Sequence, residues 1–437
     1  MRYYPDKKEF LKLAKKGNLI PVYREIMADF ETPVSAFAKI EKGNYSFFLE
    51  SVEGGERIAR YSFLGSDPSL VLSTKGKRVQ LREGNITRRF KTDTGPLGEL
   101  RKILARYKFV NVKGLPRFCG GLVGFFGYDT VRFIEDTPDK NPDDLKIPDS
   151  VFMLTDTLVI FDHVDHKLKV VSNCHVKGDP SQSYEEATRK IEELIRRVKF
   201  ADKPRNAEFL PFSLKKKTKH LKVGSNFTRN AFMASVRRAK GYIRKGDAIQ
   251  VVLSQRFEVP VRSNSFEIYR ALRSINPSPY MFYLSFPGFK LIGSSPEIMV
   301  RCEDRVVELR PIAGTRPRGK TEIEDGKLAR ELLRDPKEKA EHIMLVDLGR
   351  NDVGKVCDFK SIEVSELMAI EKYSHVMHIV SDVRGRLKKN KDIFDAMTIF
   401  PEGSFLQTFS RFGQDPMSIH GKSPSRHSAF LDFCNTA

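Results

Sequence analysis

The stretch Ser278–Thr315 reads SPYMFYLSFPGFKLIGSSPEIMVRCEDRVVELRPIAGT and consists of short apolar runs separated by turn residues. Runs rich in Val, Ile, Tyr and Phe that are bounded by Gly, Pro, Ser and Asp are typical of β-strands. Turns this short connect antiparallel neighbours, because parallel strands need a crossover of about a dozen residues or more. The stretch therefore predicts successive strands of an antiparallel sheet.

The same pattern recurs in the first part of the chain. Aromatic and β-branched runs broken by Gly, Asp and Asn occupy residues 43–72, 119–129 and 150–173. Helical periodicity is found elsewhere, at about 182–199, at about 228–246 (where Thr228 or Asn226 can cap the helix) and at about 323–348. Strands and helices do not alternate as in βαβ units, and no GxGxxG or Walker loop is present. We predict an α+β fold with large antiparallel β-sheets and no nucleotide site.

The composition is that of a globular protein with a sizeable core. The 437 residues are 40% hydrophobic and 30% charged, enough for two or three domains or one large two-layer domain. No run approaches the roughly 18 apolar residues of a membrane span, and the start MRYYPDKKEF lacks the features of a secretory signal. The five cysteines are scattered, without a CxxC pair. We expect a cytoplasmic protein without membrane contact, disulfide framework or zinc site.

The net charge of +20 raises the question of nucleic-acid binding. However, the basic residues are spread along the chain among 56 acidic ones, and the only dense run is KKKTKH at 215–220. Nucleic-acid binders usually gather such charge in one patch or stripe. We therefore expect no nucleic-acid partner, and salt-sensitive DNA binding would be the mark of that alternative. A positive field would instead favour an anionic substrate.

A polar stretch rich in Pro and Lys, ADKPRNAEFLPFSLKKKTKH, marks the expected domain boundary. We predict an amino-terminal domain over residues 1–200, a linker over 201–224, a second domain over 225–400 and a divergent tail over 401–437.

One predicted helix carries an acidic residue in its apolar stripe. In KEKAEHIMLVDLGRND, Lys337–Asp352, Glu341 lies within the same arc as Met344, Leu345 and Leu348 at about 100° per residue, and Glu338 lies at its edge. A lone ionised carboxylate on a core-facing stripe needs a partner. The partner is either a nearby cation or a metal ion, and the nearby cations are Lys337, Lys339 and Arg350.

Four further polar motifs interrupt the second half of the chain. They are GDAIQVVLSQRF (Gly246–Phe257, with Gln250 near the start of an apolar strand predicted over residues 248–261), GSSPEIMV (Gly293–Val300), RPIAGTRPRG (Arg310–Gly319) and EKYSHVMHIVSDVRG (Glu371–Gly385). Each alone has an ordinary explanation as a satisfied amide, a turn cap, a loop or a surface feature. Together they offer an acid in Glu297, a base in His378, backbone N–H groups and arginines for anions, and carboxylates for a divalent cation.

Taken with KEKAEHIMLVDLGRND, these motifs resemble the chorismate-utilising enzymes over most of residues 20–400. LES at Leu49–Ser51, ARYSFLG at Ala59–Gly65 and NPSPYMFY at Asn276–Tyr283 extend the resemblance. It implies the fold of that family, in which large antiparallel sheets form a two-layer sandwich with helices packed outside.

Two positions separate the branches of this family. Isochorismate and salicylate synthases, which activate water, carry lysine where this chain has Gln250. The para-aminobenzoate branch (aminodeoxychorismate synthase) carries a nucleophilic lysine in PIKGT, whereas this chain reads PIAGT with Ala313. Ammonia is already a nucleophile and needs no such base. The resemblance therefore points to the anthranilate branch, which converts chorismate and ammonia to anthranilate and pyruvate in the first step of tryptophan biosynthesis.

The resemblance also implies residue roles. Glu297 matches the general acid, His378 matches the histidine that assists loss of pyruvate and aromatisation, and Gln250 takes the place of the water-activating lysine. Substrate carboxylate or hydroxyl groups would be held by Gly314 and Thr315. The implied cofactor is Mg²⁺, with Glu341 as a ligand and Glu338 as a nearby or water-bridged partner.

Partners follow from the same resemblance. Ammonia would come from a separate glutamine amidotransferase subunit (component II), with a heterotetramer as the expected assembly. Tryptophan would act as a feedback inhibitor at a site lined by Glu50, Ser51, Pro279, Tyr280 and Met281.

The resemblance ends near Phe400. The family continues with a motif like FPAGTVSGAPK, whereas this chain reads FPEGSFLQTFSRFGQDPMSIHG. Our hypothesis is a reading-frame shift near codon 400, and the alternative is a divergent, naturally shortened protein. A divergent tail also agrees with two alternatives, a catalytically inactive product and a non-catalytic tryptophan- or chorismate-binding regulator.

Overall fold

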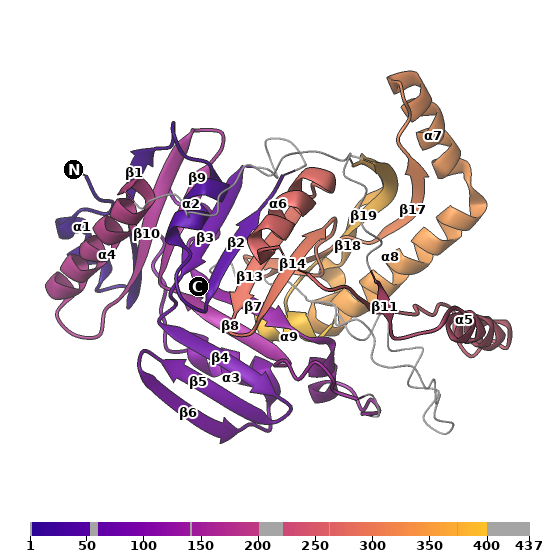
Figure 1. Ribbon diagram of the computed structural model, residues 1–437, viewed down its shortest axis with the longest axis horizontal. Helices are drawn as coiled ribbons and strands as arrows, with labels where there is room; N and C mark the ends of the chain where they lie inside the picture. The colour runs from indigo at the N-terminus through magenta and orange to yellow at the C-terminus, as the bar shows by residue number, and fades with distance from the viewer. Residues whose placement is uncertain are drawn as a thin grey trace.

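The computed structural model describes residues 2–52, 60–139, 142–200, 222–261, 263–373 and 375–399. Their strands form three large sheets and a two-stranded ribbon, and within these sheets the neighbouring strands run antiparallel (Figure 1). The predicted α+β class with large antiparallel sheets is confirmed. Within the described residues, no helix combines the length and apolar character needed to cross a membrane.

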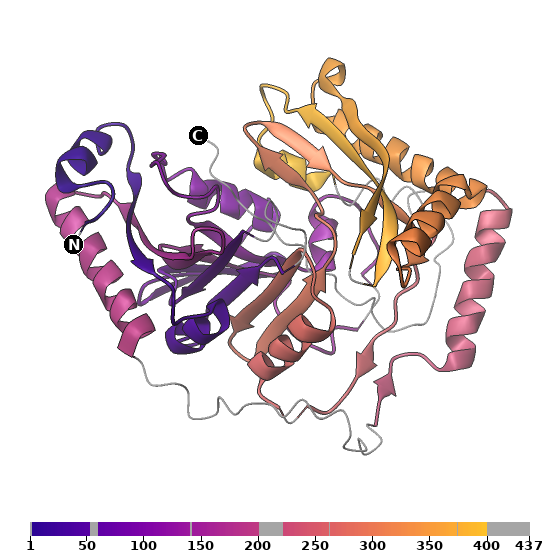
Figure 2. The same ribbon diagram turned by 90° about the horizontal axis from the view of Figure 1, so that it is seen from above.

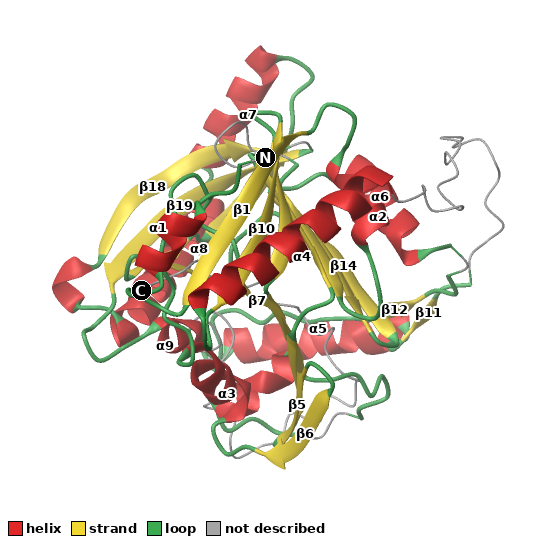
Figure 3. Ribbon diagram, turned by 90° about the vertical axis from the view of Figure 1, so that its left-hand side faces the viewer, coloured by secondary structure: helices red, strands yellow, loops and turns green. Residues whose placement is uncertain are grey.

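The largest sheet has seven strands and carries four helices. In spatial order the strands are β1 (Leu19–Met27), β10 (Lys167–His175), β9 (Thr157–Asp162), β3 (Tyr61–Ser66), β2 (Ser46–Glu50), β13 (Tyr280–Phe286) and β14 (Phe289–Ser295). The helices that share its core are α1 (Lys7–Leu13), α2 (Pro33–Ile40), α4 (Pro180–Phe200) and α6 (Ser265–Ile275). Figure 3 shows α4 lying across β1 and β10.

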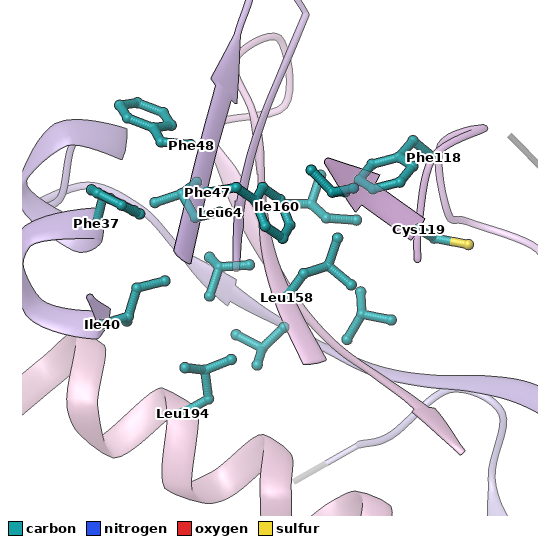
Figure 4. Close-up of a cluster of buried hydrophobic side chains, with 14 of the residues drawn as sticks. Phe37, Ile40, Phe47, Phe48, Leu64, Phe118, Cys119, Leu158, Ile160 and Leu194 are labelled. Atoms are coloured by element: carbon teal, nitrogen blue, oxygen red, sulfur yellow. The ribbon is translucent and has the colours of Figure 1, made fainter. Parts of the chain in front are cut away.

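Burial of aromatic and branched side chains holds these helices to the sheet. Phe37 of α2, Phe48 of β2 and Leu64 of β3 are fully buried and face one another in Figure 4. Removing such side chains from water contributes about 25 cal/mol per Å² of apolar surface. The α4 helix adds Leu194 to the same cluster, as its predicted amphipathic pattern requires.

The two five-stranded sheets lie beside this body. One consists of β6 (Ile86–Lys91), β5 (Arg78–Glu83), β4 (Leu70–Lys75), β8 (Ser150–Thr155) and β7 (Gly121–Phe126), covered by α3 (Gly95–Leu104) and α9 (Ile393–Thr398), with the 3₁₀ turn η1 (Tyr128–Phe133) after β7. The other consists of β15 (Arg301–Glu303), β16 (Val306–Leu309), β19 (Val376–Arg386), β17 (Ile312–Pro317) and β18 (Glu363–Lys372). Helices α7 (Glu322–Arg334) and α8 (Pro336–Val356) pack on this second sheet, followed by η2 (Phe359–Ser361).

The seven-stranded sheet joins parts of the chain from both sides of the predicted boundary. Strand β13 pairs with β2, placing Met281 opposite Glu50. Figure 2 shows β13 and β14 lying against the indigo strands of the amino-terminal half. The predicted domain division stays a prediction, since residues 201–221 and the tail over 401–437 lie outside the described residues.

The single helix predicted at about 323–348 is wrong, because the structure has two helices that meet at Asp335. Pro336 has no N–H to donate and cannot continue α7. The Asp335 carboxylate accepts from the N–H groups of Lys337 and Glu338 and so caps the new helix.

The predicted buried stripe of this helix is also wrong. Glu341 and its apolar neighbours are only half-buried, whereas the face that packs on the sheet consists of His342, Val346, Gly349, Val353 and Val356. The reason is the crossing over β17 and β19, where Gly349 lies against Pro311 and Val383. The apolar periodicity predicted the spacing of the buried residues, but the buried face of the helix begins one residue later than predicted.

The strand predicted over residues 248–261 is largely absent. Only β12 (Phe257–Glu258) forms there, and it pairs with β11 (Gly224–Ser225). A strand needs a hydrogen-bonded neighbour, and within the described residues this segment finds one over those two positions alone. Ile249 is accordingly 76% exposed.

The other two predicted helices are confirmed. The stretch at 182–199 lies within α4, and Thr228 caps α5 (Arg229–Arg244) by accepting from the Ala231 N–H. However, α5 buries none of its residues and lies at the edge of the molecule in Figures 1 and 2.

Candidate active site

The PIAGT motif forms a bulge at the edge of the sheet that α7 and α8 cover. The β17–β19 register shifts between Ala313 and Thr315, and Gly314 has a φ of 74°. A Cβ at Gly314 would lie 3.2 Å from Leu332 and Ile379 and 3.3 Å from a carboxylate oxygen of Glu338. Glycine is therefore required both by the left-handed backbone and by the close approach of α7 and α8.

The bulge contacts His378, which lies opposite Thr315 on β19. Its Nδ1 lies 3.0 Å from the Gly314 carbonyl oxygen and 3.1 Å from the Thr315 hydroxyl. A carbonyl oxygen only accepts, so Nδ1 must carry the proton. In the neutral ring Nε2 then carries no hydrogen and has a free lone pair. This tautomer can accept a proton from a substrate at Nε2.

Glu297 follows β14 in a turn closed by Ser295. The Ser295 hydroxyl donates to the Glu297 carbonyl oxygen at 2.9 Å. Although this residue reaches solvent, the protein around its carboxyl group raises the pKa to about 7 by desolvation, against the lowering effect of Arg310. A carboxylic acid with such a pKa holds a proton near neutral pH and can donate it.

Three further side chains link the surroundings of Glu297 to those of His378. The Arg310 guanidinium donates to Glu371, and the Tyr373 hydroxyl donates to the same carboxylate at 2.8 Å. The Tyr373 ring stands edge-on to the His378 imidazole, with 5.5 Å between ring centroids. Sequence reasoning missed this cluster, although Arg310 and Glu371 open two of the quoted motifs.

The arginines of RPIAGTRPRG all have carboxylate partners within the protein. Besides the Arg310–Glu371 pair, Arg316 donates to Glu331 and Asp335, and Arg318 donates to Asp325. In this structure these arginines pair with carboxylates of β18, of α7 and of Asp335 between the two helices, and their expected role in holding an anion stays a prediction. The bulge itself, with Thr315 exposed, is the polar surface that remains open to a ligand.

The two glutamates of α8 differ in their surroundings. Glu338 lies 3.6 Å from Arg316, whereas Glu341 accepts a weak hydrogen bond from the Gln250 amide at 3.4 Å. Within the described ranges Glu341 has no ion pair, so the expected salt bridge to Lys337, Lys339 or Arg350 does not form there. The Glu341 carboxylate can therefore still bind a ligand, and its neighbour Gln250 contacts it through an amide N–H.

These carboxylates fit one kind of metal ion. In the part of the chain that the structure describes, no three His, Cys, Asp or Glu side chains are grouped to hold a metal. Mg²⁺ commonly binds through one or two carboxylates and completes its shell with water and substrate oxygens. Glu341 and Glu338, three residues apart on α8, fit that ion and do not fit a self-contained zinc site.

The residues predicted to bind an inhibitor meet where β2 pairs with β13. Glu50 is buried and accepts from the Tyr269 hydroxyl and from Arg273, both at 2.6 Å. Opposite it lies Met281, and the Val52 N–H donates to the Ser278 carbonyl. Tyr280 is directed to the other side, with Arg301 3.4 Å from its hydroxyl. Ser51 and Pro279 flank the same pair of strands.

Comparisons with known proteins agree with this arrangement. The chain matches the chorismate binding enzyme family over residues 44–406. It is 46% identical to anthranilate synthase component 1 of Acetivibrio thermocellus over 92% of this chain and 81% of that protein, and 45% identical to the Aquifex aeolicus (strain VF5) protein of the same name over 91% and 79%.

Solved structures give the same result. The crystal structure of anthranilate synthase component I from Streptococcus pneumoniae TIGR4 is similar with a TM-score of 0.68 and 31% identity, over 86% of this chain and 80% of that one. The menaquinone-specific isochorismate synthase from Escherichia coli shares the fold, with a TM-score of 0.56 and 15% identity over 90% and 78% of the two chains. The chain belongs to the anthranilate synthase component 1 family of chorismate binding enzymes.

Proposed function

We propose that this protein is the large subunit of an anthranilate synthase and converts chorismate and ammonia to anthranilate, pyruvate and water. The observation that carries the proposal is the meeting of the Gly314–Thr315 bulge with His378, linked through Tyr373 to an acid whose pKa is about 7. Family membership supports the same reaction.

The first chemical problem is the leaving hydroxyl group of the substrate ring. Ammonia attacks the ring, and hydroxide leaves poorly unless it is protonated as the C–O bond breaks. Glu297 is suited to this step, because its raised pKa keeps a proton available near neutrality. Transfer of that proton releases water and leaves Glu297 ionised.

The second problem is the loss of the enolpyruvyl group as pyruvate. The ring becomes aromatic when a ring proton is removed and the C–O bond to the enolpyruvyl group breaks, with the electron pair leaving on that group. The free lone pair of His378 Nε2 can accept the ring proton, and protonation of the departing enolpyruvate gives pyruvate. The contact of Nδ1 with the Gly314 carbonyl holds the imidazole in this tautomer. The Thr315 hydroxyl and the backbone of the bulge would bind substrate oxygens and orient the ring.

Two side chains favour ammonia over water or lysine as the nucleophile. Gln250 offers an amide, which cannot deprotonate water, and it contacts Glu341. Ala313 is buried within β17 and presents no amine. These positions favour the anthranilate branch over the isochorismate, salicylate and aminodeoxychorismate reactions.

The proposed cofactor is Mg²⁺, held by Glu341 with Glu338 nearby. Bound there, it would neutralise and orient a substrate carboxylate. Ammonia would come from a glutamine amidotransferase subunit, and tryptophan would inhibit from the β2–β13 junction that contains Glu50, Ser51, Pro279, Tyr280 and Met281.

The test is anthranilate fluorescence from the full chain with chorismate, ammonium and Mg²⁺, with and without chelator. We expect product that chelator abolishes, and a Glu341→Gln variant that needs far more Mg²⁺ than the wild type. Asp347→Asn on the exposed face of α8 is the control and should leave the Mg²⁺ requirement unchanged. Wild-type protein that is folded and metal-loaded yet makes no anthranilate would overturn the proposal.

A further inference from the structure

Glu371 lies at the centre of contacts that reach both proposed catalytic groups. It is in β18, directly opposite His378 of β19 in the sheet register. One carboxylate oxygen accepts from Arg310, and the other accepts from the Tyr373 hydroxyl. Both oxygens are therefore engaged, and the side chain is 33% exposed.

Its two partners extend in different directions. Arg310 is close enough to Glu297 for its positive charge to act on that carboxyl group. Tyr373 lies edge-on to the His378 ring, and its hydroxyl also senses the charge of Glu297. A single carboxylate thus links the neighbour of the acid with the neighbour of the base.

We infer that Glu371 is a positioning residue that holds Arg310 and Tyr373 beside Glu297 and His378 and neutralises the arginine charge, so that Glu297 keeps its proton. The inference rests on the proposed function, because that proton matters only if Glu297 protonates the leaving group.

Among the described residues, Arg310, which precedes β17, is the group whose charge acts on Glu297, and the charge of Glu297 in turn raises the pKa of Tyr373, which follows β18. Although Glu297 is an exposed residue, desolvation by the protein around its carboxyl group raises the pKa, and Arg310 works against it. An unopposed cation within about 4–6 Å lowers a carboxyl pKa by about 1–3 units. The charge of Glu371 limits that effect by pairing with the guanidinium.

The same pair gives Arg310 a fixed place. Burial lowers the pKa of Arg310, and the hydrogen bond and charge of Glu371 more than offset this, so that its pKa is raised overall. Burial and the bond to Glu371 likewise raise the pKa of Tyr373, which stays a hydroxyl donor over the working pH range. Arg310 and Tyr373 therefore keep their protons while Glu297 titrates.

The experiment is a titration of the full chain labelled with ¹³C at glutamate carboxyl groups, followed by NMR. The Glu297 resonance is assigned by its loss in Glu297→Gln. In Glu371→Gln we expect its midpoint to fall by about one pH unit. Removing the cation as well, in Arg310→Gln/Glu371→Gln, should return the midpoint to the wild-type value or above.

Two further variants keep the inference testable if Glu371→Gln does not fold. Arg310→Gln alone should raise the Glu297 midpoint, because the lowering charge is gone. Tyr373→Phe is the matched control, since it removes a hydrogen bond to Glu371 and leaves the charge pair in place, and its midpoint should stay at the wild-type value. A midpoint that is the same in wild type, Arg310→Gln and Glu371→Gln overturns the inference.

Kinetics separate this inference from the proposed function. If the wild type makes anthranilate, the midpoint of the alkaline limb of its pH profile should move to lower pH in Glu371→Gln, by the same amount as the NMR midpoint. If the Arg310–Glu371 pair were merely structural, the variant would lose stability and the midpoint of the limb would not move. If the wild type makes none, the proposed function fails, and the NMR titration still decides whether Glu371 controls Glu297.

Discussion

At the scale of single residues, the site depends on which atom of an imidazole carries the proton. The Gly314 carbonyl requires a hydrogen on Nδ1 of His378, and this leaves Nε2 free to act on a ligand. The Gly314–Thr315 pair and His378 were both predicted from their motifs, because residues that are close together in a motif also lie close together in the folded chain. Their contact required the β17–β19 register, which periodicity alone does not give.

The histidine can be tested with a variant that keeps one nitrogen and removes the other. An asparagine amide placed at His378 can reproduce the Nδ1 donor to Gly314 and has no atom in place of Nε2. We expect His378→Asn to fold normally and to lose about 10²–10⁴-fold in kcat. Far-UV circular dichroism and thermal unfolding check the fold, and kcat within a few-fold of wild type would remove His378 from the mechanism.

Gly314 can be compared with a glycine of similar backbone in open space. Gly314→Ala combines a left-handed backbone with crowding by Leu332 and Ile379, and we expect a loss of about 1–3 kcal/mol in unfolding free energy. Gly76, with a φ of 52°, has nothing within 4 Å of the new Cβ, so Gly76→Ala should cost about 1 kcal/mol. Equal losses in urea unfolding would mean that the close approach of the helices is unimportant.

At the scale of elements, sequence patterns predicted which helices and strands exist better than where they begin and end or which side of them is buried. The α4 helix was predicted within two residues at its start, because its apolar residues repeat cleanly. The break at Asp335 was missed although Pro336 is a plain signal, and residues 248–261 were read as a strand from composition alone. Whether such a segment pairs depends on neighbours distant in sequence, which no local pattern contains.

The contrast between α8 and α5 gives a stability test. Val353 of α8 is fully buried, and Val353→Ala should cost about 1–3 kcal/mol through lost burial and the cavity. Val236 of α5 is 36% exposed on a helix that buries nothing, so Val236→Ala should change the unfolding free energy by less than about 0.5 kcal/mol. Equal costs in chemical denaturation would show that α5 packs against a surface the described residues lack.

At the scale of the whole molecule, the β2–β13 pair makes the two halves of the chain one sheet. Glu50 of β2, whose side chain is 2% exposed, is neutralised by Arg273 of α6 across that joint. The motifs of the predicted inhibitor residues fall on or beside the two strands that pair, and their role as an inhibitor site stays a prediction. The Arg310–Glu371–Tyr373 cluster was not foreseen, since its members come from segments that only the folded sheet brings together.

The joint can be tested by removing its cation. Arg273→Ala leaves a buried carboxylate without a counter-charge, and we expect a loss of about 2–4 kcal/mol, less than for a fully buried pair because Arg273 reaches solvent. Arg270 on the same helix pairs with Glu267 one turn away, and Arg270→Ala should cost under about 1 kcal/mol. Similar shifts for the two variants in thermal unfolding would contradict a stabilising role for the joint.

The central claim is that Glu297 donates the proton that lets the ring hydroxyl leave. It is tested most directly by the pH dependence of kcat/KM for anthranilate formation with ammonium in excess, corrected for the fraction present as ammonia. Because the protonated form is the active one, activity should fall as pH rises through a midpoint of about 7, the pKa of this carboxyl group. Glu297→Gln should lower the rate by about 10²–10⁴-fold and remove that limb. A wild-type profile that is flat across neutral pH, or a Glu297→Gln variant that keeps the same limb, would contradict the account.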